Sequence, residues 1–190
     1  MENLTFGYAL TGSFCTFEKT LGQIQYLISK GINILPIMSF NSYSIDTRFG
    51  KAKDFIERIE ALTGNKIIHT IQDAEPIGPK NLTDLMIVSP CTGNTLSKLA
   101  NGIYDTPVTL AVKSHLRNQK PVLIGVSSND SLSSSAKNIG ALLNYKHYYF
   151  IPMSQDSPEK KPFSIVCDFS KTFEAASLAL EGKQMEPIIF

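Results

Sequence analysis

Short apolar stretches alternate along the chain with longer stretches in which hydrophobic residues recur every three or four positions. Stretches 5–11, 33–39 and 84–89 belong to the first kind and predict strands, the last of them buried on both faces. Residues 17–28 and 52–62 belong to the second kind and predict amphipathic helices. Alternation of strands and helices is typical of a parallel sheet that is covered by helices on both faces.

The same patterns give the remaining expected elements. We expect further strands at 66–70, 121–127 and 147–152, further helices at 92–101, 108–118, 134–144 and 173–180, a polar loop at 40–50, and an ordered loop at 72–83. The sequence therefore predicts one α/β domain spanning residues 1–190, with three α/β/α layers and a doubly wound, mostly parallel sheet of six strands.

The last forty residues are less regular. Residues 152–167 form a proline-rich loop or flap, which is either a lid over a site or an ordinary surface excursion. Residues 170–190 contain a C-terminal helix and an apolar tail. The tail needs a partner surface, which is either its own domain or another subunit.

Composition excludes several classes of protein. In 190 residues, 43% are hydrophobic and 18% are charged, with a net charge of +1, as expected for a globular domain rather than a disordered chain or a basic nucleic-acid-binding protein. No apolar run approaches the roughly 20 residues of a membrane span, and Glu2 stands where a secretory signal has basic residues. We expect a cytoplasmic protein. Three scattered cysteines indicate neither a disulfide framework nor a zinc site.

Candidate chemistry lies in the loops that follow the expected strands, because parallel sheets bind ligands at the carboxyl ends of their strands. Thr11, Gly12 and Ser13 follow the first strand, where backbone N–H groups at a helix N-terminus can hold a phosphate without a lysine. A turn glycine with a helix cap is the alternative. The dinucleotide fingerprint G-x-G-x-x-G is absent here, which favours a mononucleotide over NAD.

Two other loops carry hydroxyl and amide groups. Ser39 begins a serine-rich segment after the second strand, which either adds donors to the same phosphate or is simply a polar loop. The stretch after strand 84–89 is more distinctive and contains Pro90, Cys91, Thr92, Asn94 and Thr95. Cys91 is a candidate reactive thiol if the helix N-terminus lowers its pKa. His115, on a helix with Lys113 and Arg117, is expected on a solvated surface.

Thr11-Gly12-Ser13, together with Pro90-x-Thr92-x-Asn94-Thr95-x-x-Lys98-x-Ala100-Asn101-Gly102, resembles the FMN-binding flavoprotein family, which includes phosphopantothenoylcysteine decarboxylases and flavin prenyltransferases. The resemblance extends over roughly residues 6–149 and implies a Rossmann-like flavoprotein fold with FMN as cofactor. Within this family the chain is most similar to the B-subunit group of dipicolinate synthases, on stretches 68–71, 74–80, 90–95, 128–130 and 136–140.

This resemblance implies a sporulation function in the mother cell of a spore-forming bacterium. The group converts dihydrodipicolinate to dipicolinate together with an A subunit that is similar to nicotinamide enzymes and would carry NAD(P). Relatives of the family form trimers or multiples of trimers, so a homo-oligomer is expected. The small dicarboxylate would be the substrate of the complex.

Site residues follow from the matching motifs. The resemblance implies that Thr11, Gly12 and Ser13 contact the FMN phosphate and that Ser39 completes this part of the pocket. Pro90, Cys91, Thr92, Asn94 and Thr95 would lie beside the ribityl chain or flavin ring, and Ser128 and Asn129 would lie in the substrate loop. His69 lies near the position of the decarboxylase histidine and is the candidate catalytic base, with a structural histidine as the alternative.

The chain also departs from the decarboxylase pattern. It has no Pro-x-Met-Asn element after the fifth strand, and Glu18 stands where many relatives have lysine. Three functions therefore remain open: an oxidoreductase-type subunit of dipicolinate synthase, a non-catalytic stabilising partner with a relic FMN site, and an FMN-dependent decarboxylase.

Overall fold

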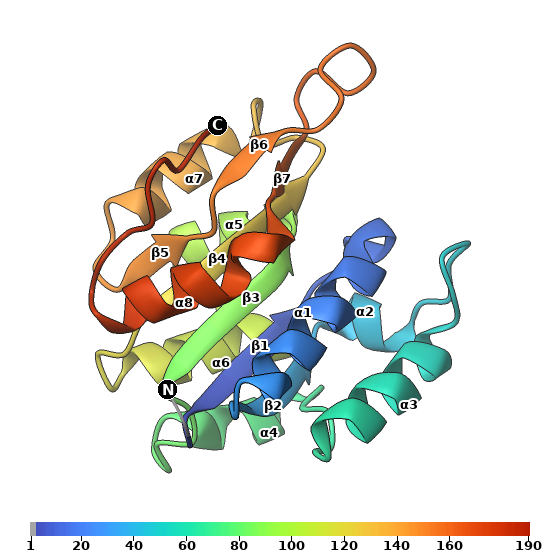
Figure 1. Cartoon of the computed structure of the whole chain (residues 1–190), viewed down its shortest axis with the longest axis vertical. Helices are drawn as coiled ribbons and strands as arrows, with labels where there is room; N and C mark the ends of the chain where they lie inside the picture. Colours follow the sequence, from blue (N-terminus) through green and yellow to red (C-terminus); the bar gives the residue numbers. More distant parts are fainter. Residues whose placement is uncertain (1–2) are drawn as a thin grey trace.

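The apolar runs of the sequence meet in one central sheet, which a computed structural model describes for residues 3–190 (Figure 1). The strands are β1 (Thr5–Leu10), β2 (Asn33–Met38), β3 (Leu85–Cys91), β4 (Val122–Ser128), β5 (Tyr148–Phe150), β6 (Met153–Gln155) and β7 (Ile165–Cys167). The α-helices are α1 (Phe17–Ser29), α2 (Phe40–Ser44), α3 (Ala52–Thr63), α4 (Ile71–Ala74), α5 (Gly93–Ala100), α6 (Pro107–Leu116), α7 (Ala136–Leu143) and α8 (Thr172–Leu180). Short 3₁₀ helices occur at η1 (Phe14–Thr16), η2 (Glu75–Ile77) and η3 (Phe169–Lys171).

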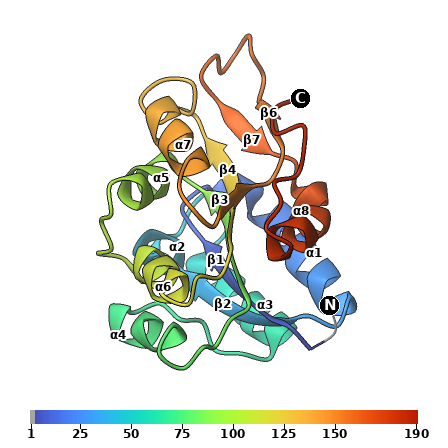
Figure 2. The ribbon, with the colours of Figure 1, turned by 90° about the vertical axis from the view of Figure 1, so that its left-hand side faces the viewer.

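Five strands are parallel and follow the order β2, β1, β3, β4, β5. The order reverses between β1 and β3, which is the switch point at which open α/β sheets bind ligands. Figure 2 shows α5, α6 and α7 on one face of the sheet and α1 and α8 on the other. All seven residues of β3 are buried, as a strand covered on both faces requires. The three-layer, doubly wound prediction is confirmed.

Strand β4 changes partners along its length. Its first half pairs in parallel with β5, whereas Ser127 and Ser128 at its end pair in antiparallel fashion with β7, which in turn pairs with β6. The segment expected as a proline-rich loop or flap is therefore a β-hairpin of two strands, and the sheet has seven strands instead of the predicted six because the expected strand at 66–70 does not form. This hairpin extends the sheet at the carboxyl edge and carries its connecting loop beyond the edge (Figure 1).

The apolar tail packs on its own domain. Ile189 forms a parallel bridge with Met153 of β6, and the Met153 N–H donates to the carbonyl of Ile188 at 2.8 Å. Ile189 and Phe190 nevertheless remain 66% and 61% exposed, so the tail is held by its backbone more than by its side chains.

The expected strand at 66–70 is reduced to one bridge between Ile68 and Ile37. The Ile68 N–H donates to the Pro36 carbonyl, and the Met38 N–H donates to the Ile68 carbonyl, both at 2.9 Å. A further ladder bond toward residue 66 would need a backbone N–H at Pro36, which proline lacks. The pairing is therefore limited to this one bridge.

Two loop predictions were too simple. Residues 40–44 form α2, because the Ser39 side chain accepts from the Ser42 N–H and caps the helix. Segment 72–83 begins with the helical turns α4 and η2, and these end near Pro76 and Gly78 as the prolines require. No helix among residues 3–190 is both long enough and apolar enough to cross a membrane.

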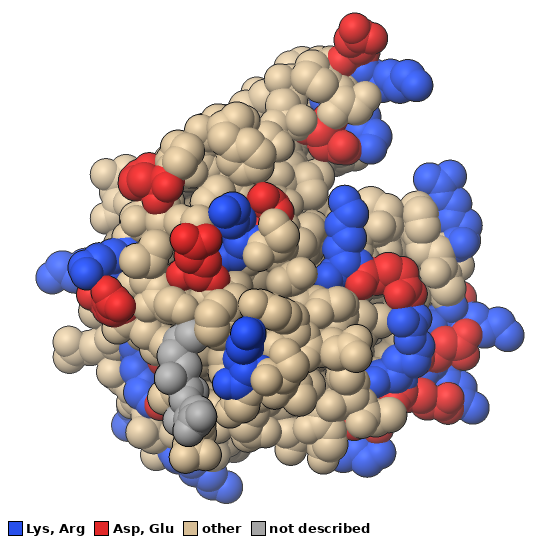
Figure 3. Space-filling view, viewed as in Figure 1, with Lys and Arg blue, Asp and Glu red and all other residues tan. Residues whose placement is uncertain are grey.

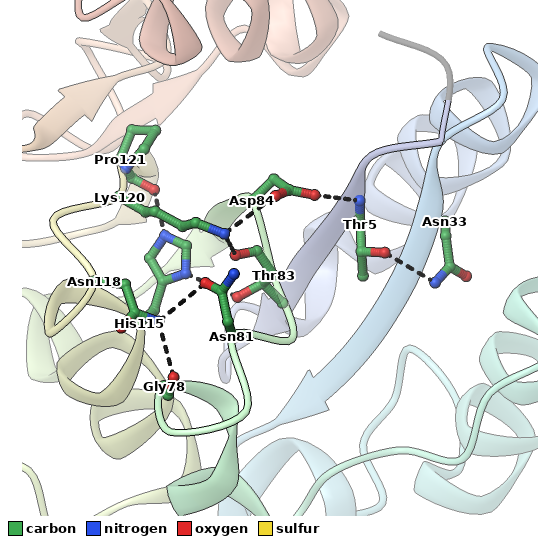
Figure 4. A network of polar contacts seen from close by, with 10 residues as sticks. All are labelled: Thr5, Asn33, Gly78, Asn81, Thr83, Asp84, His115, Asn118, Lys120 and Pro121. Carbon is green, nitrogen blue, oxygen red and sulfur yellow. Dashed lines mark hydrogen bonds and ion pairs between the residues drawn. The ribbon is translucent and has the colours of Figure 1, made fainter.

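His115 is buried at the amino edge of the sheet, opposite the candidate loops (Figure 4). The prediction of a solvated position was wrong because Lys113 and Arg117 are each two residues away, which places them on the opposite side of the helix. The His115 Nε2 lies 2.9 Å from the Pro121 carbonyl, which can only accept, so Nε2 carries the proton. Nδ1 then accepts from the Thr83 hydroxyl at 2.8 Å.

An ion pair lies beside this histidine. Lys120 Nζ donates to Asp84 Oδ1 at 3.1 Å and to the Thr83 carbonyl at 2.8 Å, and Asp84 Oδ2 accepts from the Thr5 N–H at 2.9 Å. These contacts join the starts of β1, β3 and β4 (Figure 4). Burial, reinforced by the charge of Lys120, lowers the pKa of His115 to about 4, although hydrogen bonding to Pro121 partly opposes the shift.

We expect the free energy of unfolding to decrease as the pH falls from about 6.5 to about 4. Over this interval the unfolded chain binds a proton at His115 that the folded chain does not bind, at up to about 1.4 kcal/mol per pH unit. Urea unfolding at a series of pH values measures this slope. His115→Gln should reduce the slope, and an imidazole of His115 that titrates near pH 6.5 in wild-type NMR spectra would contradict the assignment.

Candidate functional site

One cavity lies at the carboxyl edge of the sheet, where the loops after β1, β3 and β4 meet. Its volume is about 670 Å³, within the range of small-molecule sites. The hairpin β6–β7 and the turn between α2 and α3 also contribute to its wall. The lining residues are Gly12, Ser13, Phe14, Cys15, Arg48, Phe49, Thr92, Gly93, Asn94, Ser127, Ser128, Asn129, Asp130, Asp156, Lys161, Ser164 and Val166.

The side chain of Thr11 joins the first two of these loops. Pro90 interrupts β3 at a cis Ser89–Pro90 bond, and the register between β3 and β4 shifts between Val88 and Cys91. The Thr11 hydroxyl donates to the Pro90 carbonyl at 2.7 Å and accepts from the Thr92 N–H at 3.0 Å. The Thr11 N–H also donates to the Pro90 carbonyl at 3.3 Å, so the backbone and the buried side chain of Thr11, which is 1% exposed, together join the two loops.

The turn after β1 presents main-chain donors to the cavity. The Ser13 N–H donates to Thr11, and the Ser13 hydroxyl lies 2.8 Å from the Ser127 hydroxyl, across the sheet on β4. Within residues 3–190, no acceptor is found for the N–H groups of Gly12, Phe14 or Cys15. Unpaired N–H groups beside a cavity are suited to an anion such as phosphate.

Asp130, in the loop after β4, lines the same cavity. The hydroxyls of Ser128, Ser134 and Ser135 donate to its carboxylate at 2.5, 2.7 and 2.9 Å. Partial burial raises the pKa of Asp130, but these hydrogen bonds outweigh burial, so the pKa is lowered overall and the group is a carboxylate.

Ser128 connects this carboxylate to the first turn of α5. The Gly93 N–H donates to Ser128 Oγ at 3.1 Å. A Cβ at Gly93 would overlap Asp130 Oδ1 and would lie 2.6 Å from Ser135 Oγ. Glycine at position 93 therefore permits the close approach of the carboxylate to the helix.

The predicted cofactor residues fall into three groups. Six of them line the cavity together: Gly12, Ser13, Thr92, Asn94, Ser128 and Asn129. Four others, Thr11, Pro90, Cys91 and Thr95, are buried beneath or beside the lining and support it. Ser39 does not line the cavity; its side chain caps α2 and contacts Ser42.

Cys91 is not a reactive thiol in this structure. It is fully buried, and burial, followed by the nearby Cys167 sulfur, raises the pKa of its thiol. The prediction that the helix N-terminus would lower this pKa was wrong because Cys91 is the last residue of β3 and its side chain lies in the core.

His69 lies outside the cavity. Its ring stacks on that of Tyr43, with centroids 3.8 Å apart and an interplanar angle of 5°, and its Nδ1 is 3.2 Å from the Ile67 carbonyl. Both rings border a separate depression of about 580 Å³ that also includes Glu60, Lys66 and Asp73. Its catalytic role stays a prediction.

Sequence reasoning missed the residues that reach the cavity from distant segments. Arg48 and Phe49 come from the turn before α3, and Asp156, Lys161 and Ser164 come from the hairpin. The only sequence signals were a polar loop at 40–50 and a charged, proline-containing flap at 152–167. Neither signal indicates that these segments fold toward the cavity.

A model of the flavoprotein family matches residues 1–175, and a full-length curated relative agrees with it. The chain belongs to the flavoprotein family. The relative is the B subunit of dipicolinate synthase from Bacillus subtilis (strain 168), which is 42% identical over 189 residues, covering 100% of this chain and 94% of the relative.

Two solved structures of this flavoprotein's relatives extend the comparison. The crystal structure of the dipicolinate synthase B subunit from Bacillus halodurans C is 38% identical with a TM-score of 0.91, covering 100% of this chain and 97% of the other. The FMN-dependent cysteine decarboxylase SpaF is 19% identical with a TM-score of 0.71, covering 94% of this chain and 98% of the other. At this identity, SpaF shows a shared fold.

Thr11→Val tests the connection between the first two loops of the site. The variant keeps the size and branching of the side chain but loses the hydrogen bonds of the hydroxyl to Pro90 and Thr92, so we expect the free energy of unfolding to fall by about 1–3 kcal/mol. Urea unfolding measures the difference, and Thr11→Ser, which keeps the hydroxyl, is the matched control. Equal stability of the valine variant and wild type would show that the bonds to residues 90 and 92 do not hold the loops.

Proposed function

We propose that this flavoprotein binds FMN in the 670 Å³ cavity and works with a second, nicotinamide-type subunit to convert dihydrodipicolinate to dipicolinate during sporulation. The observation that carries the proposal is the convergence of three loops at one edge of the sheet. Six of the predicted cofactor residues line the same cavity. The two relatives named as B subunits of dipicolinate synthase support the reaction.

The donor set supports a phosphate group at the β1 turn. The N–H groups of Gly12, Phe14 and Cys15 have no acceptor within residues 3–190, and the hydroxyl of Ser13 adjoins them. This is the chemistry by which main-chain amides bind phosphate without a basic side chain. Asn94 and Asn129, whose side chains are exposed at the cavity wall, supply further amide groups for the polar parts of a flavin.

Aromatisation of a dihydropyridine dicarboxylate removes a hydride and a proton from the ring. Bound FMN supplies a two-electron acceptor, as does the nicotinamide of the partner subunit. The proposed task of this chain's own residues is to hold the cofactor at the β1 turn and to position the dicarboxylate in the same cavity. Three serine hydroxyls hold Asp130 as a carboxylate, which gives the cavity a negative charge at the loop after β4.

One observation favours a second candidate, the non-catalytic partner. No histidine is among the cavity-lining residues of the described chain, and His69 borders a different depression. A stabilising subunit that keeps an FMN site needs no base there. An FMN-dependent decarboxylase, the activity named for SpaF, is the third candidate.

The proposal includes assembly with the partner subunit and with further copies of this chain. Exposed apolar side chains are available for such contacts, among them Phe40, Ile45 and Phe49, which are 47%, 43% and 45% exposed. Phe40 is the first residue of α2 and Ile45 follows its last residue, whereas Phe49 lies in the turn before α3 and lines the cavity.

Gly12→Asp tests the phosphate site. The backbone at residue 12 accepts a side chain, since a Cβ would lie 3.6 Å from the nearest atom of Phe14. An added carboxylate about 5 Å from a phosphate costs about 3 kcal/mol at an effective dielectric constant of about 20, so FMN affinity should fall at least tenfold. Titration followed by flavin fluorescence measures this affinity.

Riboflavin, which lacks the phosphate, should bind the variant and wild type with similar affinity. Gly140→Asp, on the exposed surface of α7, is the matched control and should leave FMN binding unchanged. Wild-type protein that binds FMN no better than riboflavin would refute a phosphate site at residue 12. Full turnover by the Gly12→Asp protein with its partner subunit, despite lost FMN binding, would favour the non-catalytic function.

A further inference from the structure

The mouth of the cavity carries two basic side chains that the phosphate site does not use. Arg48 reaches the cavity from the turn between α2 and α3, and Lys161 reaches it from the β6–β7 hairpin. In Figure 3 the hollow opens between the projecting hairpin and the segment around residues 45–50, with Lys or Arg atoms on both sides. The two cations therefore belong to different segments that border one space.

We propose that Arg48 and Lys161 determine substrate specificity by binding the two carboxylates of a small, planar dicarboxylate. The inference rests on the proposed function, because it assigns the dicarboxylate to the same cavity as the cofactor. It adds which residues select the substrate and from which segments they come.

The turn that carries Arg48 is fixed by its own backbone. Thr47 and Gly50 exchange two hydrogen bonds of 3.0 and 3.1 Å, so Arg48 and Phe49 form the tip of a closed turn. Asp46 Oδ1 accepts from the Ala52 N–H at 2.8 Å and attaches the turn to the start of α3. A cation on such a tip loses little backbone entropy when it binds a ligand.

Arg48 is also available for a carboxylate. Within residues 3–190 it forms no ion pair, and its guanidinium carbon lies 4.8 Å from the ring centroid of Phe49. A planar guanidinium can bind a carboxylate through two parallel hydrogen bonds. Phe49 places an aromatic face beside it, suited to the ring of an aromatic ligand.

The hairpin holds Lys161 in a comparable way. The Lys161 N–H donates to the Ser157 carbonyl at 2.8 Å, and the Lys161 carbonyl accepts from the Ser164 N–H at 3.0 Å. Its Nζ contacts Asp156 Oδ2 at 2.7 Å, and the hydrogen bond and charge of Asp156 raise the pKa of the lysine, which stays cationic. Both side chains are solvated, at 56% and 38% exposed, and an exposed ion pair of this kind exchanges its carboxylate at little cost.

The remainder of the lining, among the described residues, leaves no other place for carboxylates. The turn at residues 12–15 offers neutral N–H groups that the phosphate would take, and Asp130 repels anions from the β4 side. Among the lining residues of 3–190, positive side chains are found only at the two rim segments. Phe14, Phe49 and Val166 supply apolar surface between the polar parts of the lining, as a flat ring with charged substituents requires.

The test measures binding of pyridine-2,6-dicarboxylate to the full-length chain by calorimetry, in metal-free buffer with saturating FMN and without FMN. Arg48→Gln and Lys161→Gln should each weaken this binding by about tenfold, the value of one charge-assisted hydrogen bond. Pyridine-2-carboxylate, with one carboxylate, should bind the wild type more weakly and respond to only one of the two substitutions. Lys51→Gln and Lys160→Gln, in the same two segments but outside the cavity lining, are the matched controls and should bind like wild type.

Titration with FMN and riboflavin separates this inference from the phosphate site. Unchanged FMN affinity in both rim variants, together with weakened dicarboxylate binding, supports the proposal. Wild-type affinity for the dicarboxylate in both variants would overturn it, as would a wild-type chain that does not bind the dicarboxylate. Equal weakening of FMN and the dicarboxylate would also overturn it, because the cations would then serve the phosphate. If FMN does not bind at all but dicarboxylate binding depends on both cations, the proposed FMN site fails and this inference stands.

Discussion

The hydroxyl of Thr11 holds together the edge of the sheet on which the site is built. Pro90 lies near the carboxyl end of β3, where the register with β4 shifts between Val88 and Cys91. The Thr11 hydroxyl donates to the Pro90 carbonyl at 2.7 Å and accepts from the Thr92 N–H at 3.0 Å, and the Thr11 N–H donates to the same carbonyl at 3.3 Å. The spacing between the β1 turn and the start of α5 is therefore set by three hydrogen bonds of one buried residue in a dry environment, where such bonds are strong. A looser edge would separate the donors that face the cavity.

The parallel sheet and its helices were predictable because apolar periodicity is local and strong. The topology rule for carboxyl ends then located the cavity from the sequence, and six of the predicted cofactor residues line it. The strands β6 and β7 were not predictable, since each has three residues and the two flank a charged, proline-containing segment that has the composition of a loop, whereas the equally short β5 lies in a longer apolar run. Arg48 and Lys161 were missed for a different reason: only the folded path of two remote segments brings them to the same space.

The histidines show how a local pattern can be misinterpreted. His115 was expected in solvent because charged residues stand two positions away on either side, yet a spacing of two places side chains on opposite sides of a helix. Its two ring nitrogens are paired with Thr83 and Pro121 at the amino edge of the sheet, whereas the cavity lies at the carboxyl edge. His69, which was expected at the site, instead stacks on Tyr43 beside a separate depression. The position of each histidine in the sequence did not show where its imidazole ring would lie in the fold.

Strand β4 pairs with β5 along its first half and with β7 only at its final two residues. The hairpin is thus joined to the sheet through a short antiparallel seam, outside the five strands that form the parallel core. Met153, Ile165 and Cys167 of its strands are buried in the core, whereas the connecting loop at residues 157–163 is exposed. Natural variation or an engineered exchange confined to this loop can therefore reshape the wall that carries Lys161 while the strands that anchor it stay unchanged.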